Sequence, residues 1–565
     1  MNKTRNMCNG AWICTLLAIL ASASLPGSVL AQTATPMNDQ IKELQNEIRT
    51  IEKNYQTQIR NLQKQLDALR AAQTAPKPAP VSAPTPAPAP TPGLALPPPG
   101  GVLPPPVPGG PGAPPPPPTQ AAAKGRGIFG TGINVSFANT YIEAASTFRT
   151  RNETADISSN FNTGIPMPNN PNYFLSEFRE SAHQSRLAML AQGSVNEDTK
   201  LAGYFESDFQ SAATTSNSVE SNSYNPRLRQ AYATVDKEDW GTYLLGGQAW
   251  SLLTMFNEDM TPRKENIPLT IDGQYAVGFT WTRNPQFRVV QHFGDLYAAG
   301  LSLESPQAVV FSGPNAPLVP TTFSNPGGML LNPLVNYSTD VGPDVVAKVT
   351  ADPGWGHFEL YGVGRAFRSR ANFSNHTILG GGGGVGAILP IVPKLLDFQA
   401  DFLAGNGIGR YGTVGLPDVT VKPDGVLAPI PEIQALVGLV GHPTDTIDLY
   451  AYAGIEAANS TPFTAHTASG ALPFGYGNDL YNNSACLHEA ASVTAAATNC
   501  AANTSSVWQI TGGFWWDVYK GDFGRLRVGG QGSFTERSVF AGIGGGPNTT
   551  EGIFMASLRY YPFAP

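Results

Sequence analysis

The sequence predicts an all-β transmembrane barrel of about sixteen antiparallel strands, preceded by an N-terminal α-helical coiled coil and a Pro-rich linker. Segments of about ten residues that alternate apolar and polar side chains recur from Gly127 to Phe563, as membrane β-strands do. Short polar turns and long loops rich in Ser, Thr, Asn and Gly separate these segments in alternation. Because an unpaired strand cannot satisfy its backbone groups in hydrocarbon, the alternation implies a closed barrel with a lumen.

The first residues predict export. Lys3 and Arg5 precede an apolar stretch from Ala11 to Leu25, so residues 1–31 are predicted to be a signal peptide cleaved after Ala31. No later segment offers the ~18 consecutive apolar residues of a transmembrane helix. A hydrophobic fraction of 41% and a mean hydropathy of -0.15 are also too low for a helical membrane protein. The expected location is therefore the outer membrane, with the N-terminal segment in the periplasm.

Residues 32–73 are predicted to form a periplasmic coiled coil. Apolar residues are spaced three and four apart from Met37 to Leu69, a heptad pattern with one stutter. A single amphipathic helix that lies on another surface is the alternative. A coiled coil held away from the membrane has peptidoglycan or periplasmic proteins as its expected partners.

Residues 74–120 are the predicted linker. The 43 positions from Pro76 to Pro118 include 21 prolines and one charged residue, Lys77. This composition cannot bury a core and is typical of a semi-rigid polyproline II spacer. A ligand for a Pro-binding domain is the alternative interpretation.

Residues 121–565 are the predicted outer-membrane barrel. Turn residues divide this segment into sixteen predicted strands. They are 133–137, 184–195, 201–209, 227–235, 242–252, 279–290, 296–304, 345–350, 358–367, 376–389, 396–403, 433–440, 446–457, 507–518, 523–534 and 552–563.

The connections between these strands predict an asymmetric barrel. Short turns are expected at 196–200, 237–241, 352–356, 392–394, 442–445 and 520–524, and long loops at 146–180, 211–226, 253–278, 309–342, 368–375, 405–430, 459–505 and 541–551. Short turns on one side and long loops on the other are the pattern of periplasmic turns and external loops.

Cysteine usage predicts one disulfide. Cys8 and Cys14 leave with the signal peptide, and Cys486 and Cys500 remain in one polar segment between two predicted strands. An oxidising compartment lets this pair close a loop. The pair has no CxxC spacing, so we expect no metal site.

Arginines within predicted strands are the candidate pore-lining residues, because an Arg that faces lipid at mid-depth costs ~2 to 4 kcal/mol. The candidates are Arg186, Arg227, Arg229, Arg283, Arg288 and Arg365, and Arg525, Arg527 and Arg559 also fall in predicted strands. From Ala121 onward the chain holds 26 Lys and Arg against 37 Asp and Glu, because 9 of the 35 basic and 5 of the 42 acidic residues precede it. Many of the acids lie in loops, and rings of inward arginines attract anions. The alternative is that the arginines pair with inward acids such as Glu206 and Asp208.

The loop from Leu253 to Gly278 is a candidate constriction loop. It combines opposite charges in Glu258, Asp259, Arg263, Lys264 and Asp272. Opposite charges across a narrow pore create a transverse field that filters polar solutes. An exposed loop with solvated charges is the alternative.

Several motifs carry a resemblance to a known family. They are Arg227-Leu-Arg-Gln-Ala-Tyr232, Leu245-Gly-Gly-Gln-Ala-Trp-Ser251, Leu269-Thr-Ile-Asp-Gly273 and Arg283-Asn-Pro-Gln-Phe-Arg288. With Ser185-Arg186-Leu187 and Gly203-Tyr-Phe-Glu-Ser-Asp-Phe209, the chain resembles the DcaP-like outer-membrane porins. The resemblance implies a homotrimer of barrels in outer-membrane lipid that takes up small organic anions such as dicarboxylates.

Signals for catalysis are weak, and no catalytic residue is expected. The seven histidines form no HExxH motif, and no GxSxG motif occurs. Gly381-x-Gly383-x-x-Gly386 lies in a predicted strand with no helix after it, which favours close strand packing over dinucleotide binding. We expect no cofactor and no nucleic-acid partner. The functional prediction is a porin for small hydrophilic solutes that favours anions; a sugar-selective porin, an envelope-tethering barrel and a barrel hydrolase are the alternatives.

Overall fold

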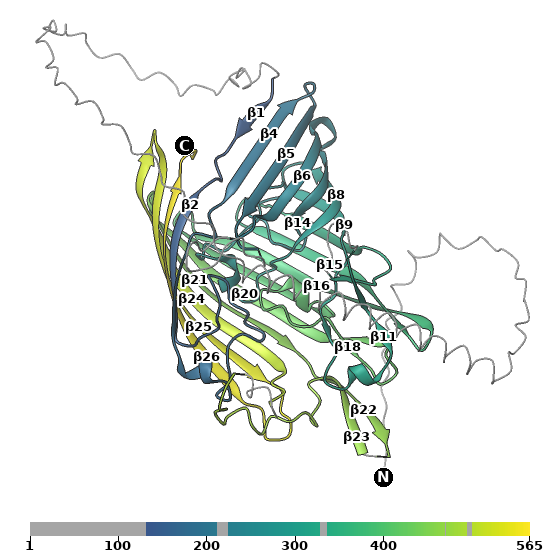
Figure 1. The fold of residues 1–565 in the computed structure, drawn as a ribbon. Helices are drawn as coiled ribbons and strands as arrows, with labels where there is room; N and C mark the ends of the chain where they lie inside the picture. The colour runs from purple at the N-terminus through teal and green to yellow at the C-terminus, as the bar shows by residue number, and fades with distance from the viewer. Residues whose placement is uncertain (1–131, 212–223, 328–335, 469, 494–499, 565) are drawn as a thin grey trace, which may run out of the picture. The chain divides into compact units, whose positions relative to one another are not determined.

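The computed structural model describes residues 132–211, 224–327, 336–468, 470–493 and 500–564 (Figure 1). The predicted signal peptide (1–31), coiled coil (32–73) and linker (74–120) lie outside the described residues, as do 121–131. The described part holds 26 β-strands and five short 3-10 helices. None of its helices has both the length and the hydrophobicity needed to cross a membrane.

One 19-stranded sheet dominates the described residues, and its ladders are antiparallel. Its strands are β1 (Asn134–Ser136), β2 (Ile142–Arg149), β3 (Glu177–Ser181), β4 (Leu187–Ser194), β5 (Thr199–Asp208), β6 (Arg227–Lys237), β7 (Thr242–Trp250), β8 (Arg283–Phe293), β9 (Tyr297–Glu304), β11 (Thr321–Thr322), β14 (Asp344–Ala351), β15 (His357–Ala371), β16 (Ser374–Val392), β17 (Leu396–Asn406), β20 (Pro431–Thr444), β21 (Ile447–Ala458), β24 (Thr504–Gly521), β25 (Gly524–Val539) and β26 (Asn548–Tyr561). The all-β antiparallel architecture predicted from the alternation is confirmed.

Neighbouring strands in the sheet are mostly neighbours in the sequence. From β4 to β9, and again from β14 through β17, β20 and β21 to β24, β25 and β26, each long strand pairs with the next long strand. The strands β9 and β14 pair along eight residues, from Tyr297↔Ala351 to Glu304↔Asp344. β2 pairs with β3 along one edge and with β26 along the other, and Figure 1 shows β2, in blue, beside β26, in yellow.

The two faces of the sheet differ in polarity, and β24 shows the pattern clearly. Gln509, Thr511 and Asp517 on one face are buried, whereas Ile510 and Phe514 on the other face are exposed. The burial alternation extends over β14, β15, β20 and β25, as a two-residue side-chain period requires. The buried face of the sheet therefore carries polar and charged side chains together with buried aromatic and aliphatic ones, and large apolar side chains occupy the exposed face.

Two of the predicted boundaries are wrong. The segment 146–180, predicted as a loop, contains the end of β2 and all of β3 except Ser181, because Glu143, Thr147 and Arg149 alternate as buried polar residues and hide the strand signal. The predicted loop 368–375 is a tight turn between β15 and β16. Asn372 and Phe373 both have positive φ, which gives the hairpin the twist that matches its strands.

Short turns join strands at one end of the sheet, as predicted, and, apart from the tight turn between β15 and β16, longer connections lie at the other. These longer connections carry structure that the alternation did not predict: β10 (Val310–Phe311) with β18 (Val419–Val421) and β19 (Leu427–Pro429), β12 (Ser324–Pro326) with β13 (Asn336–Ser338), and the hairpin β22 (Thr461–Thr467) and β23 (Gly470–Tyr476). The 3-10 helices are η1 (Pro171–Phe174), η2 (Glu238–Trp240), η3 (Gly273–Tyr275), η4 (Ala316–Leu318) and η5 (Gly409–Tyr411). Segments around Phe161, Tyr275 and Leu416 pack in one apolar cluster against the buried face.

Candidate functional site

The connection between β7 and β8, residues 251–282, lies on the buried face of the sheet, and we call it the inserted segment. Its hydrogen bonds reach strands from distant parts of the sheet. Four of its backbone N–H groups donate to side chains: Leu252 to Glu304 of β9, Phe256 to Glu359 of β15, Gly278 to Glu456 of β21, and Ile271 to Gln531 of β25. The Leu269 carbonyl accepts a hydrogen bond from the indole N–H of Trp515 of β24. Arg559 of β26 donates to the Ile271 carbonyl. The predicted constriction loop therefore crosses the buried face of the sheet and is not an exposed loop.

The inserted segment is anchored by apolar packing and by buried charge. Leu252, Leu253 and Phe256 are fully buried in one cluster with residues of β14, β15 and β17. Lys348 of β14 donates to the carbonyls of Leu253 and Thr254 and pairs with Glu359. Because these groups are buried, the pairing offsets a desolvation cost that either charge alone would leave uncompensated. The segment is therefore fixed in place by the same side chains that it covers.

Three of the predicted arginines meet in one cluster on β4 to β6, where they pair with acids. Arg227 Nη2 lies 2.6 Å from Asp208 Oδ2, and Arg229 Nη1 lies 2.9 Å from the same oxygen. Arg229 also pairs with Glu206, whose carboxylate lies 3.7 Å from Nε of Arg186. The three arginines therefore pair with Glu206 and Asp208, as the alternative interpretation of the sequence expected. The charge of these three arginines is therefore largely compensated.

Arg283, at the start of β8, has a different environment. Its guanidinium carbon lies 4.7 Å from the ring centre of Trp250 and 5.6 Å from that of Trp281, so two indoles flank the cation. Its Nη1 is buried and has no hydrogen-bond partner among the described residues. Among the described residues the cation is therefore flanked by aromatic rings and forms no ion pair with a carboxylate, which leaves Nη1 available as a donor to an anion.

A cavity of about 210 Å³ separates the arginine cluster from the inserted segment. Its charged lining residues are three arginines, Arg186, Arg229 and Arg559, and two aspartates, Asp208 and Asp272. Trp250 and Trp281, the two rings that flank Arg283, also line it. Arg559 is itself paired with Glu143 at 3.0 Å. The cavity thus combines a slight excess of positive charge with aromatic walls.

Arg288 and Arg365, two further candidate pore-lining residues, have covered positions. Arg288 is 2% exposed and donates to Gln286 and to the Trp250 carbonyl, beneath the start of the inserted segment. Arg365 is 3% exposed and pairs with Asp344 at 3.1 Å and Asp418 at 2.6 Å. Both arginines lie on the buried face, but covering segments bury them, so they do not face open space.

The charged residues predicted for the constriction loop fall into two groups. Lys264 pairs with Glu258 at 2.8 Å and Asp259 at 3.2 Å, and Arg263 Nη1 lies 3.4 Å from the Tyr232 hydroxyl. Burial acts against the charge of Lys264, but these two carboxylates raise its pKa above the ordinary value.

Asp272 lies apart from that group and beside the arginine cluster. It accepts hydrogen bonds from Gln184, Gln210 and Ser158. Only Asp272, of the five predicted charges, therefore lines the cavity next to the arginines.

Some residues of this site were not predicted. Trp250 and Trp281 lie in the predicted strands 242–252 and 279–290 and carry no sequence signal of their own, and only the fold brings them to Arg283. Lys348 had a usable signal, since it interrupts an apolar strand on the parity of Val346 and Thr350, which are buried. A charge on the buried parity of a strand predicts a partner across the sheet, and Glu359 is that partner.

The two remaining predictions concern cysteines and metals. Cys486 and Cys500 are joined by a disulfide in the connection between β23 and β24. Within the described ranges, no group of three or more His, Cys, Asp or Glu side chains is arranged to hold a metal ion.

The fold is similar to that of solved outer-membrane channels. The outer membrane channel DcaP of Acinetobacter baumannii matches with a TM-score of 0.51 at 15% sequence identity, covering 76% of this chain and 97% of that chain. An anion-selective porin from Comamonas acidovorans has a TM-score of 0.41 at 10% identity, with 76% and 98% covered, and OprB of Pseudomonas putida has 0.41 at 10%, with 75% and 94% covered. No protein-family model and no curated protein matches the chain. At this identity, the likeness to DcaP confirms the predicted resemblance at the level of the fold.

Proposed function

We propose that the chain is an outer-membrane porin that admits small hydrophilic solutes and favours small organic anions such as dicarboxylates. The observation that carries the proposal is the polarity of the sheet, which is inverted relative to a soluble β-protein. Large apolar side chains such as Phe287, Leu360 and Leu379 are exposed, whereas charged side chains such as Glu304 and Lys348 of the same sheet are buried. Lipid around the sheet and polar groups within it account for both faces.

The proposal includes closure of the sheet into a barrel of sixteen strands. β1 and β2 act as one interrupted strand, and β3 and β4 act as a second, because β1 pairs with β4, Tyr141 bridges Arg186 and β2 pairs with β3. Counting these pairs once and leaving out the two-residue β11 reduces the nineteen strands to sixteen. The ladder between β2 and β26 then joins the first strand to the last.

Contacts of the inserted segment support the same closure. One segment that bonds to β9, β15, β21, β24, β25 and β26 fits inside a ring more readily than on an open sheet. A segment inside the ring narrows the path, so only small solutes pass. The cavity of about 210 Å³ beside the arginines is the narrow polar space that this arrangement leaves.

The orientation follows from the loops. The short turns, such as those at 352–356 and 393–395, are the expected periplasmic ends, and the long connections are the expected external ends. Asn134, the first residue of β1, pairs with Gln192 near the short turn between β4 and β5, so the chain enters the sheet from the short-turn side. This placement supports a periplasmic position for the N-terminal segment. The homotrimer implied by the sequence resemblance is part of the same proposal.

Anion preference is supported by the unequal pairing of the charges. Arg186, Arg227 and Arg229 form ion pairs with Glu206 and Asp208, whereas Arg283 has no ion pair among the described residues and lies against Trp250 and Trp281. A cation without an ion pair beside the path raises the local concentration of anions without holding them tightly. Arg283 is therefore the residue on which we expect the selectivity to depend most.

The reversal potential across a planar bilayer in a KCl gradient tests this proposal. The native protein is expected to prefer chloride over potassium, and Arg283→Gln is expected to reduce that preference. Arg370→Gln removes the same charge from an exposed position near the β15–β16 turn and serves as the matched control. A preference for potassium in the native protein contradicts the proposed selectivity, and absence of any conductance contradicts the porin itself.

A further inference from the structure

A second cavity, of about 500 Å³, lies among the long connections. Its walls come from the segment 162–170, from β10, from the end of β23 and from the residues that follow Cys500. An adjoining cavity of about 570 Å³ shares Phe311, Cys500 and Asn503 with it. Cavities of this size with apolar walls and a few polar groups are typical of sites for small organic ligands.

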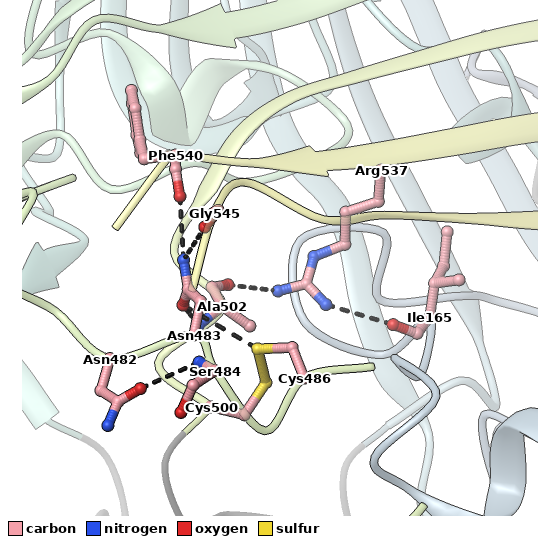
Figure 2. Close-up of a disulfide and its surroundings, with 10 residues drawn as sticks. All are labelled: Ile165, Asn482, Asn483, Ser484, Cys486, Cys500, Ala502, Arg537, Phe540 and Gly545. Atoms are coloured by element: carbon pink, nitrogen blue, oxygen red, sulfur yellow. Dashed lines mark hydrogen bonds between the residues drawn. A yellow bond between two sulfur atoms is a disulfide. The ribbon is translucent and has the colours of Figure 1, made fainter. Parts of the chain in front are cut away.

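Arg537 of β25 lines this cavity and has no ion pair with a carboxylate among the described residues. It is 4% exposed, and among the described residues its side chain donates to Thr504 Oγ1 at 2.9 Å. It also donates to the Ile165 carbonyl at 3.1 Å and to the Ala502 carbonyl at 2.6 Å, the two bonds drawn in Figure 2. Neutral oxygens thus accept all three bonds, and the titratable group that acts on Arg537 among the described residues is Tyr476. A guanidinium has five N–H donors, so two remain for a ligand.

The other walls supply an amide donor and aromatic rings. Asn503 Nδ2 is buried and has no hydrogen-bond partner in the part of the chain that the structure describes. The rings of Phe311 and Tyr476 meet edge to face, with centroids 4.9 Å apart. An unsatisfied donor and a buried cation next to aromatic surface favour a ligand that has a flat apolar body and one carboxylate.

The disulfide holds one wall of the cavity in position. Cys500 lines the cavity, and Cys486 is fully buried beside Asn483 (Figure 2). The Asn483 side chain donates to the carbonyls of Phe540 and Gly545, each at 3.0 Å, and accepts from the backbone N–H of Ala502 at 3.1 Å. These bonds tie the disulfide loop to the connection between β25 and β26, so the cavity is built before any ligand arrives.

We propose that this cavity binds small aromatic monocarboxylates, with Arg537 and Asn503 on the carboxylate and Phe311 and Tyr476 against the ring. The inference rests on the proposed function, for which it supplies a capture site on the long-loop side, separate from the arginine cluster beside the inserted segment. A competing explanation is that Arg537 only ties Ile165, Ala502 and Thr504 together. The two explanations differ in whether a carboxylate binds.

Isothermal titration of the full-length protein in detergent with benzoate tests the inference. Benzoate is expected to bind saturably. Benzyl alcohol lacks the charge and acetate lacks the ring, so each is expected to bind at least about tenfold more weakly than benzoate. Arg537→Gln is expected to weaken benzoate by about tenfold or more, as loss of a charge-assisted hydrogen bond does. Arg370→Gln, at an exposed site outside the cavity, is the matched control and is expected to bind as the native protein does.

Asn503→Leu keeps the test decisive if Arg537→Gln does not fold. The Asn503 amide nitrogen has no hydrogen bond to lose within the described ranges, so this variant is expected to fold normally and to bind benzoate more weakly. Native affinity in folded Arg537→Gln or in Asn503→Leu overturns the inference, as does the absence of saturable benzoate binding to the native protein. Conductance in bilayers is measured separately: a protein that conducts without binding benzoate refutes only this inference, and one that binds benzoate without conducting refutes only the porin proposal.

Discussion

Substitution of an arginine for Ile510 tests whether the exposed face of the sheet lies in lipid. Ile510 is 55% exposed near the middle of β24, where it pairs with Ala453 and Phe534. An arginine that faces lipid at mid-depth costs ~2 to 4 kcal/mol. Since each ~1.4 kcal/mol is tenfold, Ile510→Arg is expected to lower the folding equilibrium constant by about 30- to 700-fold. The same change on a face in water costs little, because arginine is then hydrated.

The assay is reversible unfolding by urea from lipid vesicles, followed by tryptophan fluorescence. Phe373→Arg is the matched control, because Phe373 is 96% exposed in the turn between β15 and β16, where the proposed barrel leaves the membrane. Its free energy of unfolding is expected to change by ~0 to 1 kcal/mol. Equal stability of the two variants refutes the assignment of the exposed face to lipid.

Three further predictions concern buried groups. Lys348→Met leaves Glu359 as a buried charge without its partner, so the free energy of unfolding is expected to fall by about 3 to 5 kcal/mol. An additional Glu359→Gln is expected to recover part of that lost stability. An unchanged urea midpoint in Lys348→Met argues against the buried pair. Replacing Cys486 and Cys500 by Ala removes a cross-link between residues 14 apart in sequence, which is expected to cost about 3 kcal/mol in the same assay, and a loss near zero contradicts the cross-link. Burial raises the pKa of Glu265 above its ordinary value of 4.5, so the folded state holds this proton more tightly than the unfolded state does, and stability is lost as pH rises above that value. Glu265→Gln removes this loss, so its Tm relative to the native protein is expected to increase with pH, and parallel profiles contradict the burial effect.

Strand positions were predictable because the exposed and buried faces differ in polarity. The predicted strands 242–252 and 396–403 correspond to β7, Thr242–Trp250, and β17, Leu396–Asn406. The two-residue alternation of side chains is a property of each strand alone, so it can be recognised in the sequence without knowing which strands pair. β2 escaped prediction because Glu143, Thr147 and Arg149 give its buried face the composition of a loop.

The site was predictable only in part, because it depends on contacts that are distant in sequence. Arg227 and Arg229 were expected to face inward because an arginine in lipid is costly, and their pairing with Asp208 follows from the neighbouring strand. No local pattern shows that Arg288 is covered by the inserted segment or that Arg537 lines a cavity with the residues after Cys500. Those placements depend on which strands the long loops pack against, and the composition of a loop does not predict that.

A disulfide across the seam between β2 and β26 tests closure of the barrel most directly. Ala145 and Ser557 are opposite each other in the ladder and are both buried, so cysteines at these positions are expected to cross-link spontaneously in folded protein. Cysteines at 145 and 556 are the control, because Ala556 is opposite Ser146 and points to the other face. The account predicts a shift in mobility on a denaturing gel that reducing agent reverses, for the 145/557 pair and not for the 145/556 pair. Folded protein in which the 145/557 pair does not cross-link contradicts a closed barrel and, with it, the lumen on which the proposed porin function depends.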